Sequence, residues 1–189
     1  MKAVLHSEPN LKVTTYQDLI LVRSLMNQNQ PLRFGLGFDR HQLVSKRPFY
    51  LGGVRISSPV GPMGHSDGDL LLHAITDAIL GAIGAGDIGD FFSDRDRRWR
   101  NAKSERFVKT AIEMAAQKGF RPAQVDATIV LQKPKLGKKK KIVQARVAKL
   151  LNLSSDNVSI KAKTAEGLGP EGLSLAASCQ ALVVLTSNE

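Results

Sequence analysis

Residues 69–83 read DLLLHAITDAILGAI, and this stretch decides the fold of the chain. Its large apolar side chains recur at the spacing of one helix face: Leu72, Ile75, Ile79, Leu80 and Ile83. The pattern predicts a helix from Asp69 onward that buries this face. Ser66 or Asp67, just upstream, is expected to cap the helix, because a side-chain oxygen there can accept a hydrogen bond from a free backbone N–H.

Two short strands are predicted upstream of this helix. Residues 33–38 and 49–56 are largely apolar and enclose a polar loop, so we expect them to pair as a hairpin. Gly52-Gly53 in the second segment indicates either a bulge or a close backbone approach.

Downstream, amphipathic patterns predict helices over about 104–118 and 138–151, and strands over 125–132, 158–163 and 176–185. The order of strands and helices predicts an α+β fold, with a mostly antiparallel sheet covered on one face by helices.

Length and composition favour one domain with an appendage. The chain has 189 residues, of which 42% are hydrophobic, enough for one core. The polar run at residues 27–30, closed by Pro31, is typical of a linker. We therefore expect an N-terminal extension and linker over 1–31 and a domain over 32–189. No apolar run is long enough to cross a bilayer, so no membrane partner is expected, and no secretory signal is evident. The cytoplasm is the expected location, with a plastid-type organelle left open.

The net charge of +10 predicts an anionic partner, either a nucleic acid or a phosphorylated metabolite. Aromatic residues are few and do not alternate with basic ones, which disfavours nucleic-acid binding. Cys179 is the single cysteine, which excludes a disulfide framework and a multi-cysteine zinc site, and its apolar surroundings predict a buried, inert thiol.

Three residues form a candidate metal site. Asp39 and His41 are two residues apart at the end of a predicted strand, so their side chains leave the same face. His73 lies on the following helix, one turn from Asp69 and one turn from Asp77. A lone histidine there is more often a satisfied core residue. Together, the three residues suit a two-histidine, one-carboxylate zinc site with an open fourth position.

The run Gly64-His65-Ser66-Asp67-Gly68-Asp69 places an imidazole, a hydroxyl and free amides at a helix start, where phosphate is favoured. Helix capping alone would explain the presence of Ser66 and Asp67, but it would not explain the presence of His65 or of the flanking glycines.

A second polar segment, Gly86-Asp87-Ile88-Gly89, precedes Asp94 and Asp96. This segment could bind polyol hydroxyls. Alternatively, its acidic residues are simply exposed to solvent in a loop, which is equally common.

Near the C-terminus, residues 161–169 leave a strand and enter a glycine-containing turn. Glu166 could hold a hard divalent cation, and Thr164 could donate to a phosphoryl oxygen. An exposed polar turn is the alternative. The lysine run at 138–141 is better explained as a solvated helix start.

Several of these motifs, in this order, together resemble one known family: residues 37–41 (GFDRH), 52–56 (GGVRI), 65–69 (HSDGD), His73, 87–89 (DIG) and 161–162 (KA). Over residues 32–186 the chain resembles the cyclodiphosphate synthases of the non-mevalonate isoprenoid pathway. The resemblance implies a homotrimer of α+β subunits with active sites between neighbouring subunits. It also implies zinc bound by Asp39, His41 and His73.

The resemblance assigns further roles. His65 and Thr164 would stabilise the transition state, and Glu166 would lie near a magnesium or manganese ion. The residues implied to contact a small-molecule cytidine diphosphate substrate are Asp39, His41, His65, Ser66, Asp87, Gly89, Asp94, Pro134, Lys135, Leu136, Ala162, Lys163, Thr164 and Glu166.

The implied reaction closes a cyclic diphosphate. The substrate's own 2-phosphate attacks the β-phosphorus and expels CMP, so positioning and charge neutralisation should carry the rate enhancement. A zinc phosphohydrolase that activates water is the enzymatic alternative. A basic RNA-binding domain, with salt-sensitive affinity, is the non-enzymatic one.

Two features depart from or extend beyond this pattern. Many relatives have a phosphate-contacting arginine in the turn where Leu173 stands, and Leu173 cannot replace that charge, which leaves the kinetic competence of the chain open. Many also have an acid where Gln180 stands, which puts an isoprenoid diphosphate site on the trimer axis in doubt as well. Residues 10–19 resemble the tail of the cytidylyltransferase earlier in the pathway. They are interpreted as the remnant of a fusion, with a chance strand and helix as the alternative.

Overall fold

The computed structural model describes residues 13–27 and 31–188. The chain divides into two compact units, residues 1–31 and 32–189. The first contains helix α1 (Tyr16–Asn27), whose start is capped by Asp18: its carboxylate accepts from the backbone N–H of Thr14 and Thr15. Residues 28–30 of the expected linker, and residues 10–12 of the cytidylyltransferase-like stretch, lie outside the described residues.

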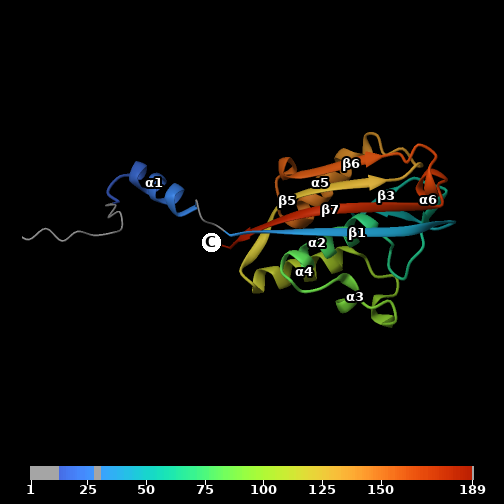
Figure 1. Cartoon of the computed structure of the whole chain (residues 1–189), viewed down its shortest axis with the longest axis horizontal. Helices are drawn as coiled ribbons and strands as arrows, with labels where there is room; N and C mark the ends of the chain where they lie inside the picture. Colours follow the sequence, from blue (N-terminus) through green and yellow to red (C-terminus); the bar gives the residue numbers. More distant parts are fainter. Residues whose placement is uncertain (1–12, 28–30, 189) are drawn as a thin grey trace, which may run out of the picture. The chain divides into compact units, whose positions relative to one another are not determined.

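The second unit is built on a sheet in the order β4-β1-β7-β5-β6. The strands are β1 (Leu32–Ser45), β4 (Val60–Pro62), β5 (Phe120–Val130), β6 (Val158–Lys163) and β7 (Ala176–Ser187). The pairs β1–β4, β1–β7 and β5–β7 are antiparallel, whereas β5 and β6 run parallel. The parallel pair is joined through α5 (Lys139–Leu151), which supplies the crossover that parallel strands need (Figure 1).

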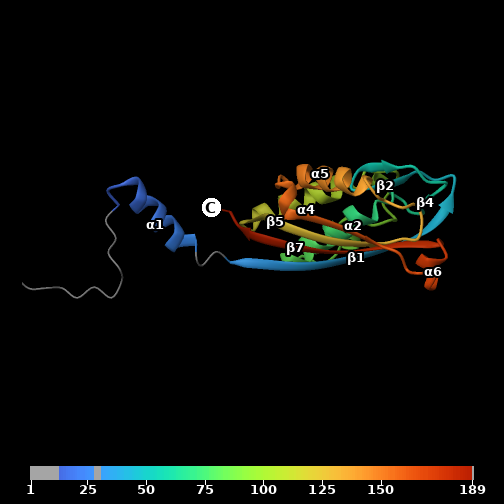
Figure 2. The same cartoon turned by 90° about the horizontal axis from the view of Figure 1, so that it is seen from above.

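Helices cover one face of this sheet. Figure 2 shows α2 (Leu70–Ala82), α4 (Glu105–Gln117) and α5 together on one side of the strands. The core lies between these two layers, with Leu71, Ile75 and Ile129 fully buried. Cys179 is also buried there, and burial raises the pKa of its thiol, as expected for an inert cysteine. The predicted α+β fold is therefore confirmed, with a mixed sheet.

The predicted hairpin between residues 33–38 and 49–56 is wrong. The first strand continues through the supposed loop to Ser45 and pairs with β7 and β4. Residues 49–56 instead form their own hairpin from β2 (Phe49–Leu51) and β3 (Val54–Ile56). Gly52 and Gly53 are its two-residue turn rather than a bulge, with φ of 60° and 74°, values that glycine adopts without strain.

Other element boundaries shift by a few residues. The strand predicted over 125–132 is β5, which begins at Phe120 and ends at Val130, and β7 extends to Ser187. The connecting segments hold short helices: α3 (Ile88–Phe91), η1 (Arg97–Trp99), η2 (Ser155–Asn157) and α6 (Gly169–Gly172). In the described part of the chain, no helix has the length and apolar character that crossing a bilayer requires.

The N-cap of α2 is Asp69, and neither Ser66 nor Asp67 takes that role. Its buried carboxylate accepts from the N–H of Leu72 at 3.1 Å and from the N–H groups of Gly52 and Gly53 at 2.9 and 2.6 Å. One side chain thus caps the helix and anchors the β2–β3 turn. Burial raises the pKa of Asp69 to about 6.

Strand β1 lies directly on α2. A Cβ at Gly35 would lie 1.7 Å from the carbonyl oxygen of Ala78, and one at Gly37 would lie 1.9 Å from that of Ala74. Both distances are far inside van der Waals contact, so the two backbones can meet only because glycine has no side chain.

The opposite face of β1 is apolar and exposed. Phe34 and Leu36 are each 62% exposed and Phe38 is 56% exposed, and Leu182 of β7 is 39% exposed. These four residues are called the outer apolar face below.

Gly37→Ala is expected to lower the free energy of unfolding by at least about 2 kcal/mol, because the new methyl group meets backbone that cannot yield. Urea denaturation should show a lower midpoint. Gly81→Ala is the matched control, since it lies in α2 with nothing within 4 Å of the added Cβ. That variant should gain roughly 0.5–1 kcal/mol. Equal losses in the two variants would contradict the close contact.

The raised pKa of Asp69 predicts a pH-dependent stability. The folded state holds this proton more tightly than the unfolded state, whose pKa is the ordinary 3.8, so folding is favoured by protonation. The contribution of Asp69 is therefore present below pH 3.8 and is lost as pH rises to about 6. As the pH falls from about 6 to 3.8, the unfolding free energy of wild type should increase relative to that of Asp69→Asn. A difference independent of pH would show that burial does not raise this pKa.

Candidate metal and ligand site

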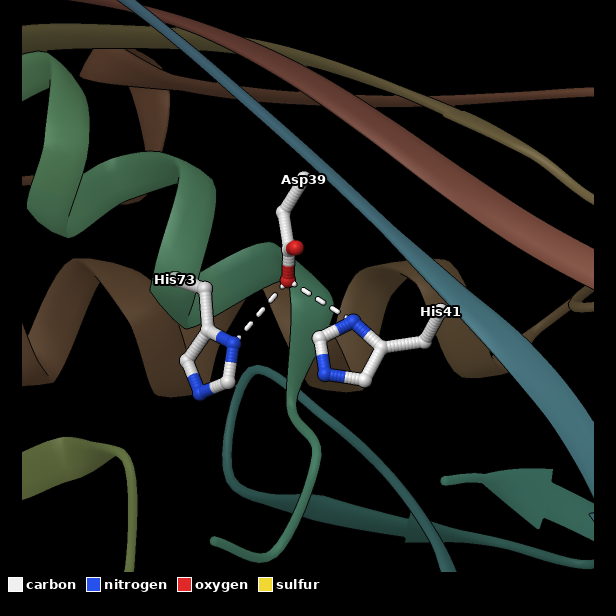
Figure 3. Close-up of side chains that lie close together, drawn as sticks. All are labelled: Asp39, His41 and His73. Atoms are coloured by element: carbon white, nitrogen blue, oxygen red, sulfur yellow. Dashed lines mark hydrogen bonds and ion pairs between the residues drawn. The ribbon is translucent and has the colours of Figure 1, made fainter. Parts of the chain in front are cut away.

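Asp39, His41 and His73 converge as the sequence predicted. Asp39 and His41 project from the same face of β1, and His73 comes from α2 (Figure 3). The Asp39 Oδ2 atom lies 3.0 Å from Nδ1 of His41 and 2.9 Å from Nδ1 of His73. One ligand atom from each residue lies within 4.8 Å of the others, which is compatible with a single ion.

The electrostatics of this cluster favour a cation. Burial alone would raise the pKa of Asp39, but the imidazoles of His41 and His73, which both lie within 3.0 Å of its carboxylate, hold it well below its ordinary value. For His73, burial acts to lower the pKa, and it is outweighed by the hydrogen bond that His73 donates to Asp39 and by the negative charges of Asp39, Asp69 and Asp67. The net pKa of His73 is raised, so positive charge is stabilised at this point.

The residues present fit a metal ion. The buried Nδ1 of His41 makes no hydrogen bond within the described part of the chain, although it points toward Asp39. A buried polar atom without a hydrogen-bond partner requires an explanation, and coordination of a metal ion by this nitrogen would provide one. Two imidazoles and one carboxylate are a donor set typical of zinc sites that keep a position open. Asp69, which the sequence placed beside His73, instead directs its carboxylate to the β2–β3 turn.

A cavity of about 450 Å³ adjoins the cluster. The predicted site residues that line it are His41, His65, Ser66, His73, Gly89 and Asp94. Phe92, Trp99 and Phe107 form an aromatic wall that the sequence did not indicate, with the Phe92 and Phe107 rings stacked at 4.5 Å. The site therefore combines a candidate metal-binding corner, formed by Asp39, His41 and His73, with an open cavity that could hold a small ligand.

The loop of residues 64–69 is held from outside by residues that sequence reasoning missed. The Arg47 guanidinium donates to the carbonyl oxygens of Gly64 and Ser66, the latter at 2.8 Å. The Asp67 carboxylate accepts from the backbone N–H of Ser104, at the start of α4. Of these residues, only Ser104 could have been singled out from the sequence, because it stands at the predicted start of a helix.

Asp87 has a local structural role. It caps α3, where its carboxylate accepts from the N–H of Gly89 at 2.8 Å and that of Asp90 at 3.2 Å. The residues lining the cavity include Gly89 and Asp94 but not Asp87.

The remaining predicted residues form a separate group at the far edge of the sheet: Pro134, Lys135, Leu136, Ala162, Lys163, Thr164 and Glu166. None of them lines the cavity described above. The side chain of Leu136 is buried in the core, and the Thr164 hydroxyl donates to the Glu166 carboxylate.

The strand order separates these two groups. Asp39 lies opposite Cys179, Cys179 opposite Ile129, and Ile129 opposite Ala162. Three strand spacings, roughly 14 Å in all, therefore lie between the metal-binding corner and the second group within one chain.

Comparison with known proteins places these features in a family. The model of the YgbB family matches residues 32–186. The bifunctional enzyme IspD/IspF of Pelagibacter ubique (strain HTCC1062) is 41% identical over 179 residues, which are 95% of this chain and 48% of that protein. The chain thus spans about half the length of this bifunctional relative.

Shorter relatives match along nearly their whole length. The 2-C-methyl-D-erythritol 2,4-cyclodiphosphate synthase of Solibacter usitatus (strain Ellin6076) is 47% identical over 154 residues, covering 82% of this chain and 97% of that protein. A solved synthase of the same name, described as the CDP-bound form, is 41% identical with a TM-score of 0.75, covering 81% of this chain and 99% of that one. By sequence and fold, this chain belongs to the YgbB family.

Proposed function

We propose that this chain converts 4-diphosphocytidyl-2-C-methyl-D-erythritol 2-phosphate to 2-C-methyl-D-erythritol 2,4-cyclodiphosphate with release of CMP, as a phosphorus–oxygen lyase of isoprenoid precursor biosynthesis. The observation that carries the proposal is the convergence of Asp39, His41 and His73 beside a cavity in a chain of this family. The CDP-bound synthase supports a cytidine nucleotide as part of the substrate.

The chemistry follows from the groups present. An oxygen of the substrate's 2-phosphate forms a bond to the β-phosphorus, and the bond from that phosphorus to the bridging oxygen breaks, so that CMP leaves with the electron pair. The attacking oxygen is already ionised, so no strong general base is required. We assign the zinc to Asp39, His41 and His73, where the bound ion would neutralise phosphate charge. His65 and Ser66 line the same cavity and can donate to phosphate oxygens.

The second group of residues is assigned to the cytidine diphosphate end of the substrate: Pro134, Lys135, Leu136 and 162–166. Glu166, beside Thr164, is assigned to a magnesium or manganese ion, whose hard character suits a carboxylate. Asp87, Gly89 and Asp94 are assigned to the methylerythritol moiety. Because one chain holds the two ends roughly 14 Å apart across its sheet, a second subunit is the natural source of the nucleotide-binding group.

The outer apolar face supports a homotrimer. Phe34, Leu36 and Phe38 stand on alternate positions of β1, on the face opposite α2, α4 and α5. Exposed apolar surface of this kind is characteristic of interfaces between subunits. A ring of three copies would cover the face and bring the second group of one subunit toward the metal-binding corner of the next.

Leu173 and Gln180, where the chain departs from many relatives, are both exposed. Leu173 is 64% exposed and follows α6, and Gln180 pairs with Phe38 in the ladder. Arg40, which is two residues from Phe38 on β1, forms an ion pair with the buried Glu171 at 2.9 Å. These observations support the expectation that an isoprenoid diphosphate would find no strong anion site there.

The N-terminal extension is assigned to the tail of a fused cytidylyltransferase. The family model begins at residue 32, whereas the match to the bifunctional enzyme covers 95% of the chain and so reaches into residues 1–31.

The cyclase activity is tested by phosphorus NMR with the substrate, zinc and magnesium. Wild type should give the cyclic diphosphate and CMP, and His73→Ala should lose at least about a hundredfold in rate because the metal site is broken. Thr76→Ala is the matched control: it removes a buried hydroxyl from the same helix, away from the cavity, and should retain activity. Linear hydrolysis products would favour the phosphohydrolase, and salt-sensitive RNA affinity without turnover would favour the nucleic-acid-binding alternative.

The trimer is tested by sedimentation velocity. Wild type should sediment with about three times the 20.5 kDa mass of the chain, whereas Leu36→Glu should sediment as the monomer because its charge would be buried in the interface. Ile142→Glu is the control, since Ile142 is a 50% exposed apolar residue of α5 on the helix-covered side. The monomeric variant should also lose turnover. A monomeric wild type with full activity would refute the shared site.

A further inference from the structure

Two serine hydroxyls lie beside the Nε2 atom of His73, on the side of the ring away from Asp39. Ser104 Oγ is 2.9 Å from this nitrogen and Ser66 Oγ is 3.1 Å from it. Ser104 is fully buried. Its hydroxyl also donates to the Asp67 carboxylate, so Asp67, Ser104 and His73 form a continuous chain of hydrogen bonds.

The position of Ser104 makes this arrangement unusual. Ser104 is the N-cap of α4, where a serine side chain ordinarily accepts from a backbone N–H of the first turn. Its side chain makes no capping hydrogen bond. The hydroxyl is instead turned toward His73, while the Asp67 carboxylate accepts the Ser104 N–H. Capping therefore does not explain where this hydroxyl points.

The direction of the Ser104 hydrogen bonds favours a proton on Nε2 of His73. A serine hydroxyl has one proton, and that of Ser104 is donated to Asp67. Toward His73, Ser104 can therefore act only as an acceptor, which requires a proton on Nε2. With Nε2 protonated, Nδ1 is the nitrogen that would release its proton, which is now donated to Asp39, and offer its lone pair to a metal.

We propose that Ser104, oriented by Asp67, is a positioning residue that holds the Nε2 proton of His73 and so presents Nδ1 to the metal. The inference rests on the metal site assigned under Proposed function. Partners of this kind fix the tautomer and ring orientation of a ligating histidine and increase its metal affinity.

The arrangement also explains the position of Ser66. Its oxygen accepts from the N–H of Gly68 at 3.1 Å and lies near the same His73 nitrogen. Because Nε2 already carries a proton, the Ser66 hydroxyl proton is not needed there. It remains available for a phosphate oxygen in the cavity that Ser66 lines.

The test measures zinc affinity by competition with a chromophoric chelator, on the full chain. Ser104→Ala should weaken zinc binding by about 10- to 100-fold, the usual cost of removing a partner of a ligating histidine. Asp67→Asn keeps an oxygen that can accept from Ser104 and should weaken binding less. Thr76→Ala, the matched buried-hydroxyl control on α2, should bind zinc within about twofold of wild type. Thermal unfolding of the metal-free variants shows whether each variant folds. If Ser104→Ala does not fold, the zinc affinity of Asp67→Asn tests the proposal instead.

Imidazole nitrogen NMR provides the readout that a purely structural role would not change. Zinc-loaded wild type should show His73 protonated at Nε2 and metal-bound at Nδ1. If Nε2 is metal-bound, or if Ser104→Ala and Thr76→Ala bind zinc equally well, the proposal is overturned while the metal site stands. If wild type binds no zinc and His73→Ala changes nothing, the assigned metal site fails as well.

Discussion

The contact between the backbones of β1 and α2 is the constraint on which the rest of this structure depends. At Gly35 and Gly37 the strand meets the carbonyl oxygens of the helix with no side chain between them. Asp39 and His41 follow immediately on the same strand face, so the close approach carries them to His73. A wider spacing, as a normal strand–helix packing would give, would separate the donors of the carboxylate and imidazole cluster.

The two faces of the sheet, and its two edges, carry residues of different kinds. One face packs under the helices and holds the core, and the other presents Phe34, Leu36 and Phe38. Along the sheet, β7 and β5 separate the metal-binding corner from the group assigned to the nucleotide. Both features support the proposed site between subunits, in which each chain would provide one half of the site at each edge.

Much of the fold and of the metal-binding corner could be predicted from the sequence. Residues 69–83 carry a strong helical period, and Asp39 and His41 have the two-residue spacing of a strand face. The continuation of β1 to Ser45 could not be predicted, because Asp39, Arg40, His41 and Gln42 are poor strand formers alone and are held by pairing with β7. Ser104 was unpredictable as a partner of His73, since 31 residues separate the two and only tertiary packing joins them.

The placement of all three assigned ligands on a strand and a helix has a consequence for metal exchange. Their backbone positions are fixed by the β1–β7 ladder and by the buried face of α2, neither of which requires an ion. In zinc fingers, by contrast, much of the binding free energy drives folding. Here little of it is needed to order the chain, so binding strength is set by the ligands and their immediate partners. Chelation should accordingly strip the metal reversibly from a folded protein, and different divalent ions should compete for one preorganised geometry.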